Sequence, residues 1–191
     1  MDSPLRLYRP LAVAFGEAVR AVHDDQWGDP TPCTEWDVRH LVNHLAYETL
    51  WVTPLMGGAT VEEVGDRFDG DVLGADPKAT WASAADDAIA AVEAVSPDRL
   101  VHLTGRDVTA TDYAGELVLD LFVHRWDLAK ATGADATLDP DLAAEFGRAI
   151  VPFESVLRAT GLFGVKVDVP EDADPSTKLL GMLGRRADWA P

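Results

Sequence analysis

The stretch GELVLDLFVHRWDLAKATG, residues 115–133, decides the fold because its apolar side chains recur at helical spacing along its whole length. It closes on Gly133, the residue type that commonly follows the last turn of a helix. We therefore predict a helix over about Tyr113 to Thr132. This helix holds Asp120 and His124 one turn apart within an apolar run, where a carboxylate and an imidazole are costly to bury without partners.

Proline, glycine and aspartate divide the region before this stretch into three further long helices. The first is expected from about residue 4 to 27. The second is expected from about Glu35 to Met56, with Thr34 as its N-cap. Asp76 followed by Pro77 is typical of a helix start and predicts the third, which runs to about Val95.

The remaining segments are shorter or less regular. Residues 57–74 are expected to form a loop with room for a helical turn, and residues 96–112 either a small hairpin or an extended connection. After Gly133, we predict a helix from Pro140 to Thr160, a strand-like piece in the tail, and a last helix near Pro175 to Leu183. Long amphipathic helices without alternating strands predict an all-α fold, a helical bundle that forms a single domain over residues 1–191.

Composition narrows the function classes. The chain has 191 residues, 47% of them hydrophobic, which fits one domain with a sizeable core. Its formal net charge of -17 disfavours binding to nucleic acid or to an anionic membrane surface. We find no apolar run that could cross a bilayer and no signal-peptide pattern at the N-terminus. The single cysteine, Cys33, cannot form an internal disulfide, so a reducing cytoplasm is the expected compartment.

Two of the predicted helices carry residue types that bind metal ions. His40, His44 and Glu48 follow one another at four-residue steps on the second helix, and His44 lies beside apolar neighbours. Asp120 and His124 have the same spacing on the fourth helix. Metal sites in helical bundles are built from such short-spaced ligands together with a ligand from a facing helix. The pattern favours a divalent-metal site near His44, Asp120 and His124, where imidazole and carboxylate ligands would suit zinc, nickel, manganese or iron.

Simpler interpretations stay open. Asp120 and His124 could form only an ion pair, and each histidine could be a hydrogen-bonded core residue. His40 is expected to be exposed. Glu48 and Asp127 are candidates for orienting a ligand histidine, and they are weak candidates for a catalytic base.

For Cys33 and the tryptophans, we expect structural roles. Cys33 precedes the second helix, where a helix N-terminus can activate a thiol. Because we identify no histidine partner near it in the sequence, we expect an inert or capping-region thiol rather than a nucleophile. The larger aromatic residues are expected in the core or in a cavity wall; these are Trp36, Trp51, Trp81 and Trp126.

Three motifs, TPCTEWDVRHLVNHL (31–45), DLFVHRWDLAKATG (120–133) and FGVKVDVPEDADPSTKLLGMLGRRADW (163–189), resemble a known family. They are similar to short actinobacterial metal-binding proteins of the DinB-like superfamily, related to the N-terminal domain of mycothiol-dependent maleylpyruvate isomerase. The resemblance implies a DinB-like four-helix bundle. It also implies a divalent metal, usually zinc, bound by a histidine eight residues after a tryptophan and by a later Glu-x-x-x-His pair.

Matching this pattern onto the chain gives the same three residues. His44 falls eight residues after Trp36, and His124 takes the place of the later histidine. Asp120 stands where the family has glutamate, so its shorter side chain must lie closer to the metal or reach it through a water molecule.

The resemblance further implies a thiol-dependent transferase or isomerase that uses mycothiol on small electrophiles. The isomerase has a C-terminal domain that this chain is expected to lack, which argues against maleylpyruvate isomerisation itself. The partners implied are a small thiol and an electrophilic substrate, with a homodimer left open. The alternatives are a non-catalytic metal-binding or ligand-binding protein of the DinB-like stress-response type, and a purely structural bundle.

Overall fold

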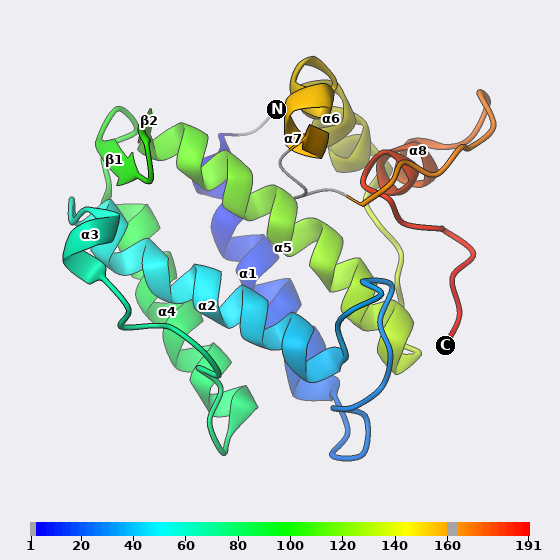
Figure 1. The fold of residues 1–191 in the computed structure, drawn as a ribbon, viewed down its shortest axis with the longest axis horizontal. Helices are drawn as coiled ribbons and strands as arrows, with labels where there is room; N and C mark the ends of the chain where they lie inside the picture. Colours follow the sequence, from blue (N-terminus) through cyan, green and yellow to red (C-terminus); the bar gives the residue numbers. More distant parts are fainter. Residues whose placement is uncertain (1–2, 160–163) are drawn as a thin grey trace.

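A computed structural model describes residues 3–159 and 164–191 of the chain. Four long helices form its main body: α1 (Pro4–Ala21), α2 (Val38–Met56), α4 (Pro77–Ala94) and α5 (Ala110–Thr132). Helices α1 and α2 each pack against both α4 and α5, as Figure 1 shows. This arrangement confirms the predicted all-α bundle of the DinB-like type.

Local hydrogen bonds explain where the long helices begin. Asp76 caps α4 by accepting from the Ala79 N–H, as predicted. The prediction for α2 was wrong, because Asp37 rather than Thr34 accepts from the His40 N–H and is the N-cap. Helix α5 begins earlier than predicted because Thr109 and Asp112 form a reciprocal capping box.

The first helix ends six residues before the predicted end, at Ala21, because Val22 adopts an extended backbone conformation. Residues 22–37 then form a long connection that lies at the end of the bundle away from the hairpin (Figure 1). This connection carries Cys33 and Trp36 to the α2–α5 side of the bundle, so it contributes directly to the candidate site.

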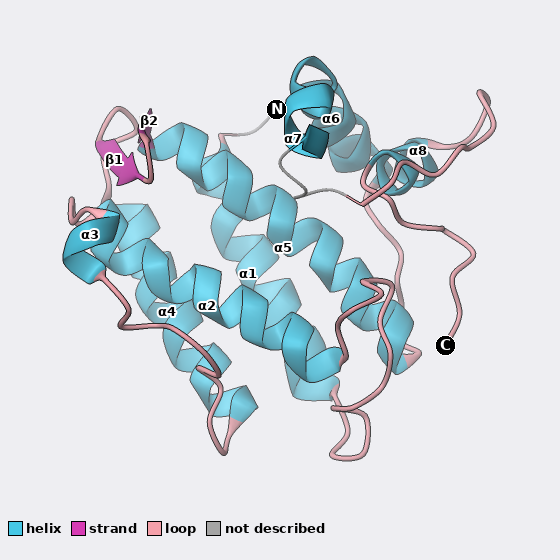
Figure 2. Ribbon diagram, viewed as in Figure 1, coloured by secondary structure: helices cyan, strands magenta, loops and turns pink. Residues whose placement is uncertain are grey.

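The predicted helical turn and hairpin are both present. Helix α3 (Val61–Val64) occupies the loop after α2, and β1 (Leu100–Leu103) pairs antiparallel with β2 (Arg106–Thr109). Figure 2 shows this hairpin at the end of the bundle where α5 begins. Of the two structures left open for residues 96–112, the hairpin is therefore correct.

The C-terminal region differs from the prediction in two places. Gly133 ends α5 in the left-handed conformation, with φ 73°, as expected. The next helix is divided into α6 (Pro140–Ile150), a 3-10 turn η1 (Val151–Phe153) and α7 (Glu154–Ala159), because Pro152 removes a backbone donor. Thr160, the predicted end, lies outside the described residues.

The predicted strand-like piece is absent from residues 164–174, and Val167 instead donates to the carbonyl of Gly181. That carbonyl belongs to α8 (Pro175–Met182), the predicted last helix. Helix α8 packs on α6, and Phe146 of α6 contacts Phe122 of α5 with ring centroids 5.2 Å apart. These contacts attach the C-terminal region to the bundle.

A continuous hydrophobic core runs through the bundle, and α5 is buried along most of its length. Trp81 packs against Phe15 with ring centroids 4.6 Å apart, and it leaves room only for a glycine at position 16. Trp51 and Trp126 are also buried, which confirms the expectation for these tryptophans. Among the described residues, none of the helices combines the length and apolarity needed to cross a membrane.

Candidate metal centre

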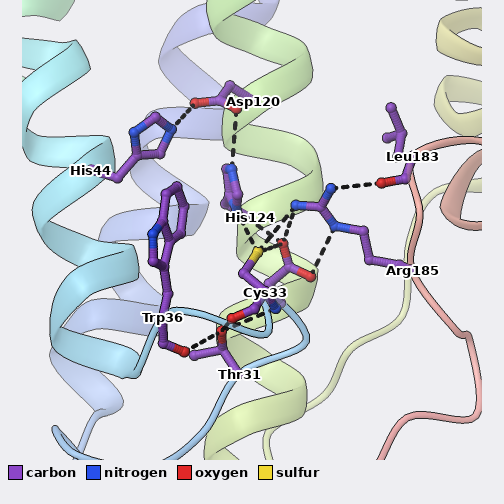
Figure 3. A network of polar contacts seen from close by, with 9 residues as sticks. Thr31, Cys33, Trp36, His44, Asp120, His124, Leu183 and Arg185 are labelled. Atoms are coloured by element: carbon purple, nitrogen blue, oxygen red, sulfur yellow. Dashed lines mark hydrogen bonds and ion pairs between the residues drawn. The ribbon is translucent and has the colours of Figure 1, made fainter. Parts of the chain in front are cut away.

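Helices α2 and α5 bring His44, Asp120 and His124 to one point inside the bundle. His44 Nε2 lies 3.1 Å from Asp120 Oδ2, and His124 Nε2 lies 3.2 Å from Asp120 Oδ1. Figure 3 shows His44 of α2 reaching across to Asp120 of α5, with His124 one turn further along α5. One nitrogen or oxygen atom of each residue lies within 4.8 Å of those of the other two. The predicted residues therefore converge.

Exposure differs among the three residues. The His124 side chain is only 7% exposed, whereas those of His44 and Asp120 are 27% and 35% exposed. The point where they meet is thus closed on the His124 side and accessible from the His44 and Asp120 side.

The cluster is strongly polarised. Burial by itself raises the pKa of Asp120, but His124 and His44 outweigh burial and hold that pKa well below its ordinary value. Burial by itself lowers the pKa of His124, but Asp120, Asp127 and Cys33 outweigh it and raise that pKa well above its ordinary value. Without a metal, these shifts favour an aspartate anion paired with a protonated His124.

Asp127 holds the other nitrogen of His124. Its side chain is fully buried, and Oδ2 lies 2.9 Å from His124 Nδ1. The same Oδ2 accepts from Arg185 Nη2 at 2.9 Å, while Oδ1 accepts from Arg185 Nε at 3.4 Å. Burial favours a higher pKa for Asp127, but His124 and Arg185 lower it below its ordinary value. This contact has the geometry expected of a carboxylate that orients a ligand histidine.

Cys33 does have a histidine neighbour, which sequence reasoning did not identify, while its expected inertness stays a prediction. Its Sγ lies 3.9 Å from His124 Nδ1, 3.4 Å from Asp127 Oδ2 and 3.3 Å from Arg185 Nη2. The Thr31 hydroxyl donates to the carbonyls of Cys33 and Trp36 and accepts from the Cys33 N–H, which folds this loop back toward α5. Sequence spacing cannot reveal a contact made by such a loop.

Cys33, His124 and Asp127 form a second group whose ligand atoms lie within 4.8 Å of one another. The guanidinium of Arg185 already contacts both the thiol and the carboxylate of this group. Since a resident cation repels a metal ion, the group of His44, Asp120 and His124 is the better candidate.

Trp36 and Glu48 lie near the centre, whereas His40 does not take part in it. The Trp36 ring lies 4.8 Å from the His44 ring and 5.7 Å from the His124 ring between centroids, so it forms a wall, as expected. Glu48 is half-buried one turn beyond His44; burial raises its pKa, His44 lowers it, and Asp120 raises it, for a net increase. His40 is exposed and pairs with Asp37, which confirms its expected exposure.

Residues 8–129, more than half of the chain, match the family model of the mycothiol maleylpyruvate isomerase N-terminal domain. The chain belongs to this family. Two uncharacterized proteins, from two strains of Mycobacterium tuberculosis, are each 32% identical to it over 186 residues, covering 95% of this chain and 97% of theirs.

Two solved structures share the fold of this family member. A crystal structure of the mycothiol-dependent maleylpyruvate isomerase has 16% sequence identity and a TM-score of 0.67, covering 97% of this chain and 89% of that chain. A histidine-to-alanine mutant of the isomerase has 18% identity and a TM-score of 0.57, covering 74% of this chain and 67% of that one. At these identities the superpositions establish the fold alone.

Because the superposition covers 97% of this chain, it extends beyond residue 129, where the family match ends. The family match includes His44, Asp120, His124 and Asp127 but ends before Arg185, which sequence reasoning also missed.

Proposed function

We propose that this protein binds a divalent metal ion with His44, Asp120 and His124, and that it is a thiol-dependent transferase or isomerase acting on small electrophiles. The observation that carries the proposal is the convergence of two imidazole nitrogens and a carboxylate from two helices. Family membership supports mycothiol as the thiol, because the family is named after a mycothiol-dependent isomerase domain.

The donor set fits such an ion. Imidazole nitrogen and carboxylate oxygen suit zinc first, and also nickel, manganese or iron. Three protein ligands leave further coordination positions for water or substrate. The shorter side chain of Asp120 still reaches both imidazoles directly, at 3.1 and 3.2 Å, so the replacement of the family glutamate does not remove the carboxylate from the centre.

A bound divalent cation supplies one chemical effect, the stabilisation of a coordinated thiol as thiolate at neutral pH. The protein's own residues supply position and proton transfer. Asp127 fixes the His124 ring, and Trp36 covers the two histidine rings on one side. Glu48 is our candidate for moving a proton, because its raised pKa brings proton exchange closer to neutrality.

The tail belongs to the same unit in this proposal. Arg185, close to the C-terminus, contacts Asp127 beside the centre. We therefore propose that residues 1–191 act as one metal-binding domain.

The test is turnover by zinc-loaded and chelator-treated protein with mycothiol and a panel of electrophiles that includes maleylpyruvate. Both thiol consumption and substrate conversion are followed, because an isomerase regenerates its thiol. We expect turnover that requires metal, is lost in His44→Ala and persists in His40→Ala, whose side chain is exposed one turn earlier on α2. Turnover that is independent of metal contradicts the proposal.

The second candidate is a non-catalytic protein that holds a metal or small ligand. It is favoured by the contacts of Asp120 with both histidines, since these already give the carboxylate polar partners without a metal ion. This candidate predicts zinc binding that is lost in His44→Ala, without turnover of any electrophile in the panel.

A further inference from the structure

The two ring nitrogens of His124 face different partners. Nε2 points to Asp120 and the candidate metal point, at 3.2 Å, while Nδ1 lies 2.9 Å from Asp127 Oδ2. A histidine that binds metal commonly donates its second ring N–H to a carboxylate, and this donation fixes the ring and leaves the other nitrogen free to coordinate. Asp127 is placed to perform this task for His124.

Asp127 in turn depends on Arg185. A carboxylate that is fully buried requires an opposite charge and hydrogen-bond donors nearby. Arg185 provides both, since its Nη2 and Nε contact the two carboxylate oxygens at 2.9 and 3.4 Å. The Arg185 side chain is itself only 13% exposed, so water replaces it poorly.

The end of α8 is shaped to present this guanidinium. The Arg185 N–H donates to the Leu180 carbonyl at 2.8 Å, and Arg185 Nη1 donates to the Leu183 carbonyl at 2.9 Å. Gly184 has φ 82°, and a Cβ there would lie 2.9 Å from the backbone of Gly164. Figure 3 shows Arg185 entering the network from the tail, on the side away from His44.

We infer that Arg185 is a positioning residue of the metal centre, acting through Asp127 on His124, so that docking of the C-terminal segment and metal affinity are coupled. The inference rests on the proposed metal site. Coupling between two binding events is reciprocal. Docked Arg185 strengthens metal binding, and bound metal strengthens the docking of the segment.

The neighbouring residue offers a matched control. Arg186 carries the same charge, but its side chain is 67% exposed and pairs with Asp188 at 3.0 Å within the tail. Arg185→Gln and Arg186→Gln therefore change the net charge equally, and only the first removes the partner of Asp127.

The first experiment measures zinc affinity by competition with a chromophoric chelator. We expect Arg185→Gln to weaken binding roughly 10–100-fold, the range typical of a lost partner behind a metal ligand. Arg185→Lys recovers part of the loss, because an ammonium keeps the charge but not the two-pronged geometry. Arg186→Gln binds zinc as the wild type does.

The second experiment measures amide hydrogen exchange over residues 179–185 with and without zinc. We expect zinc to slow exchange there in the wild type and in Arg186→Gln, and to have no such effect in Arg185→Gln. A purely structural Arg185 would alter the unfolding temperature but leave this zinc dependence unchanged. If Arg185→Gln does not fold, Arg185→Lys is compared with the wild type in the same two measurements.

The outcomes separate the two claims. A wild-type protein that binds zinc with the same affinity as folded Arg185→Gln overturns the Arg185 inference and leaves the metal site standing. A wild-type protein that binds no zinc overturns the metal site and, with it, the inference.

Discussion

The buried carboxylate of Asp127 offers the sharpest test of the network in the metal-free protein. Asp127→Asn keeps the shape of the side chain and removes its charge. Arg185 and His124 both face this group, and His124 has a raised pKa, so two cations lose their shared anion. Removing one partner of a buried ion pair costs about 3–5 kcal/mol. Because asparagine keeps one oxygen as an acceptor for Arg185, we expect the lower end of that range.

For a chain of this size, each kcal/mol shifts the unfolding midpoint by about 2–4 °C, so Asp127→Asn should lower it by roughly 6–12 °C. The assay is thermal unfolding followed by circular dichroism at pH 7 with a chelator present. Asp188→Asn is the control, since Asp188 forms an exposed ion pair with Arg186 and should have no measurable effect. An Asp127→Asn midpoint equal to that of Asp188→Asn would refute the reasoning.

Two further predictions concern protons and helix termination. Because the pKa of His124 is raised, a metal ion must displace its proton, and zinc affinity should rise with pH. Calorimetry in buffers of different ionisation enthalpy should show the release of this proton. A zinc affinity that does not depend on pH contradicts the prediction. In the metal-free protein, the contribution of His124 to stability is complete below pH 6.5 and is lost as pH rises through its raised pKa, whereas the contributions of Asp120 and Asp127 are present above pH 3.8 and are lost in acid. The urea midpoint of unfolding should therefore be highest between pH 3.8 and pH 6.5. A midpoint that keeps rising above pH 6.5 opposes the assignment. Gly133→Ala should lower the free energy of unfolding in urea by about 1 kcal/mol, because φ is 73° at Gly133. Gly28→Ala is the control, since Gly28 has no positive φ. Equal urea midpoints for the two variants argue against the left-handed helix end.

The features that could be predicted from sequence depend on short-range spacing. Helical periodicity directly predicts the pair Asp120 and His124 and the apolar stripe around His44. Local backbone chemistry predicts the start of α4 at Asp76 and the end of α5 at Gly133. The convergence of the two helices at one point was predicted from the same spacing together with the family resemblance.

The features that sequence reasoning missed depend on tertiary contacts. Arg185 meets Asp127 across 58 residues of chain, and Cys33 reaches His124 only because the loop around Thr31 folds back. The N-cap of α2 was misplaced because Thr34 and Asp37 are both good caps, and only the turn before the helix selects Asp37. No periodicity in the sequence encodes any of these contacts.

Both proposals depend on the binding of one divalent ion by His44, Asp120 and His124. The most direct measurement is the zinc content of each protein after loading, desalting and elemental analysis. We predict one zinc ion per chain in the wild type and in His40→Ala, and a loss of bound zinc in His44→Ala. Zinc retained by His44→Ala at the wild-type level, or absent from the wild type, would contradict it.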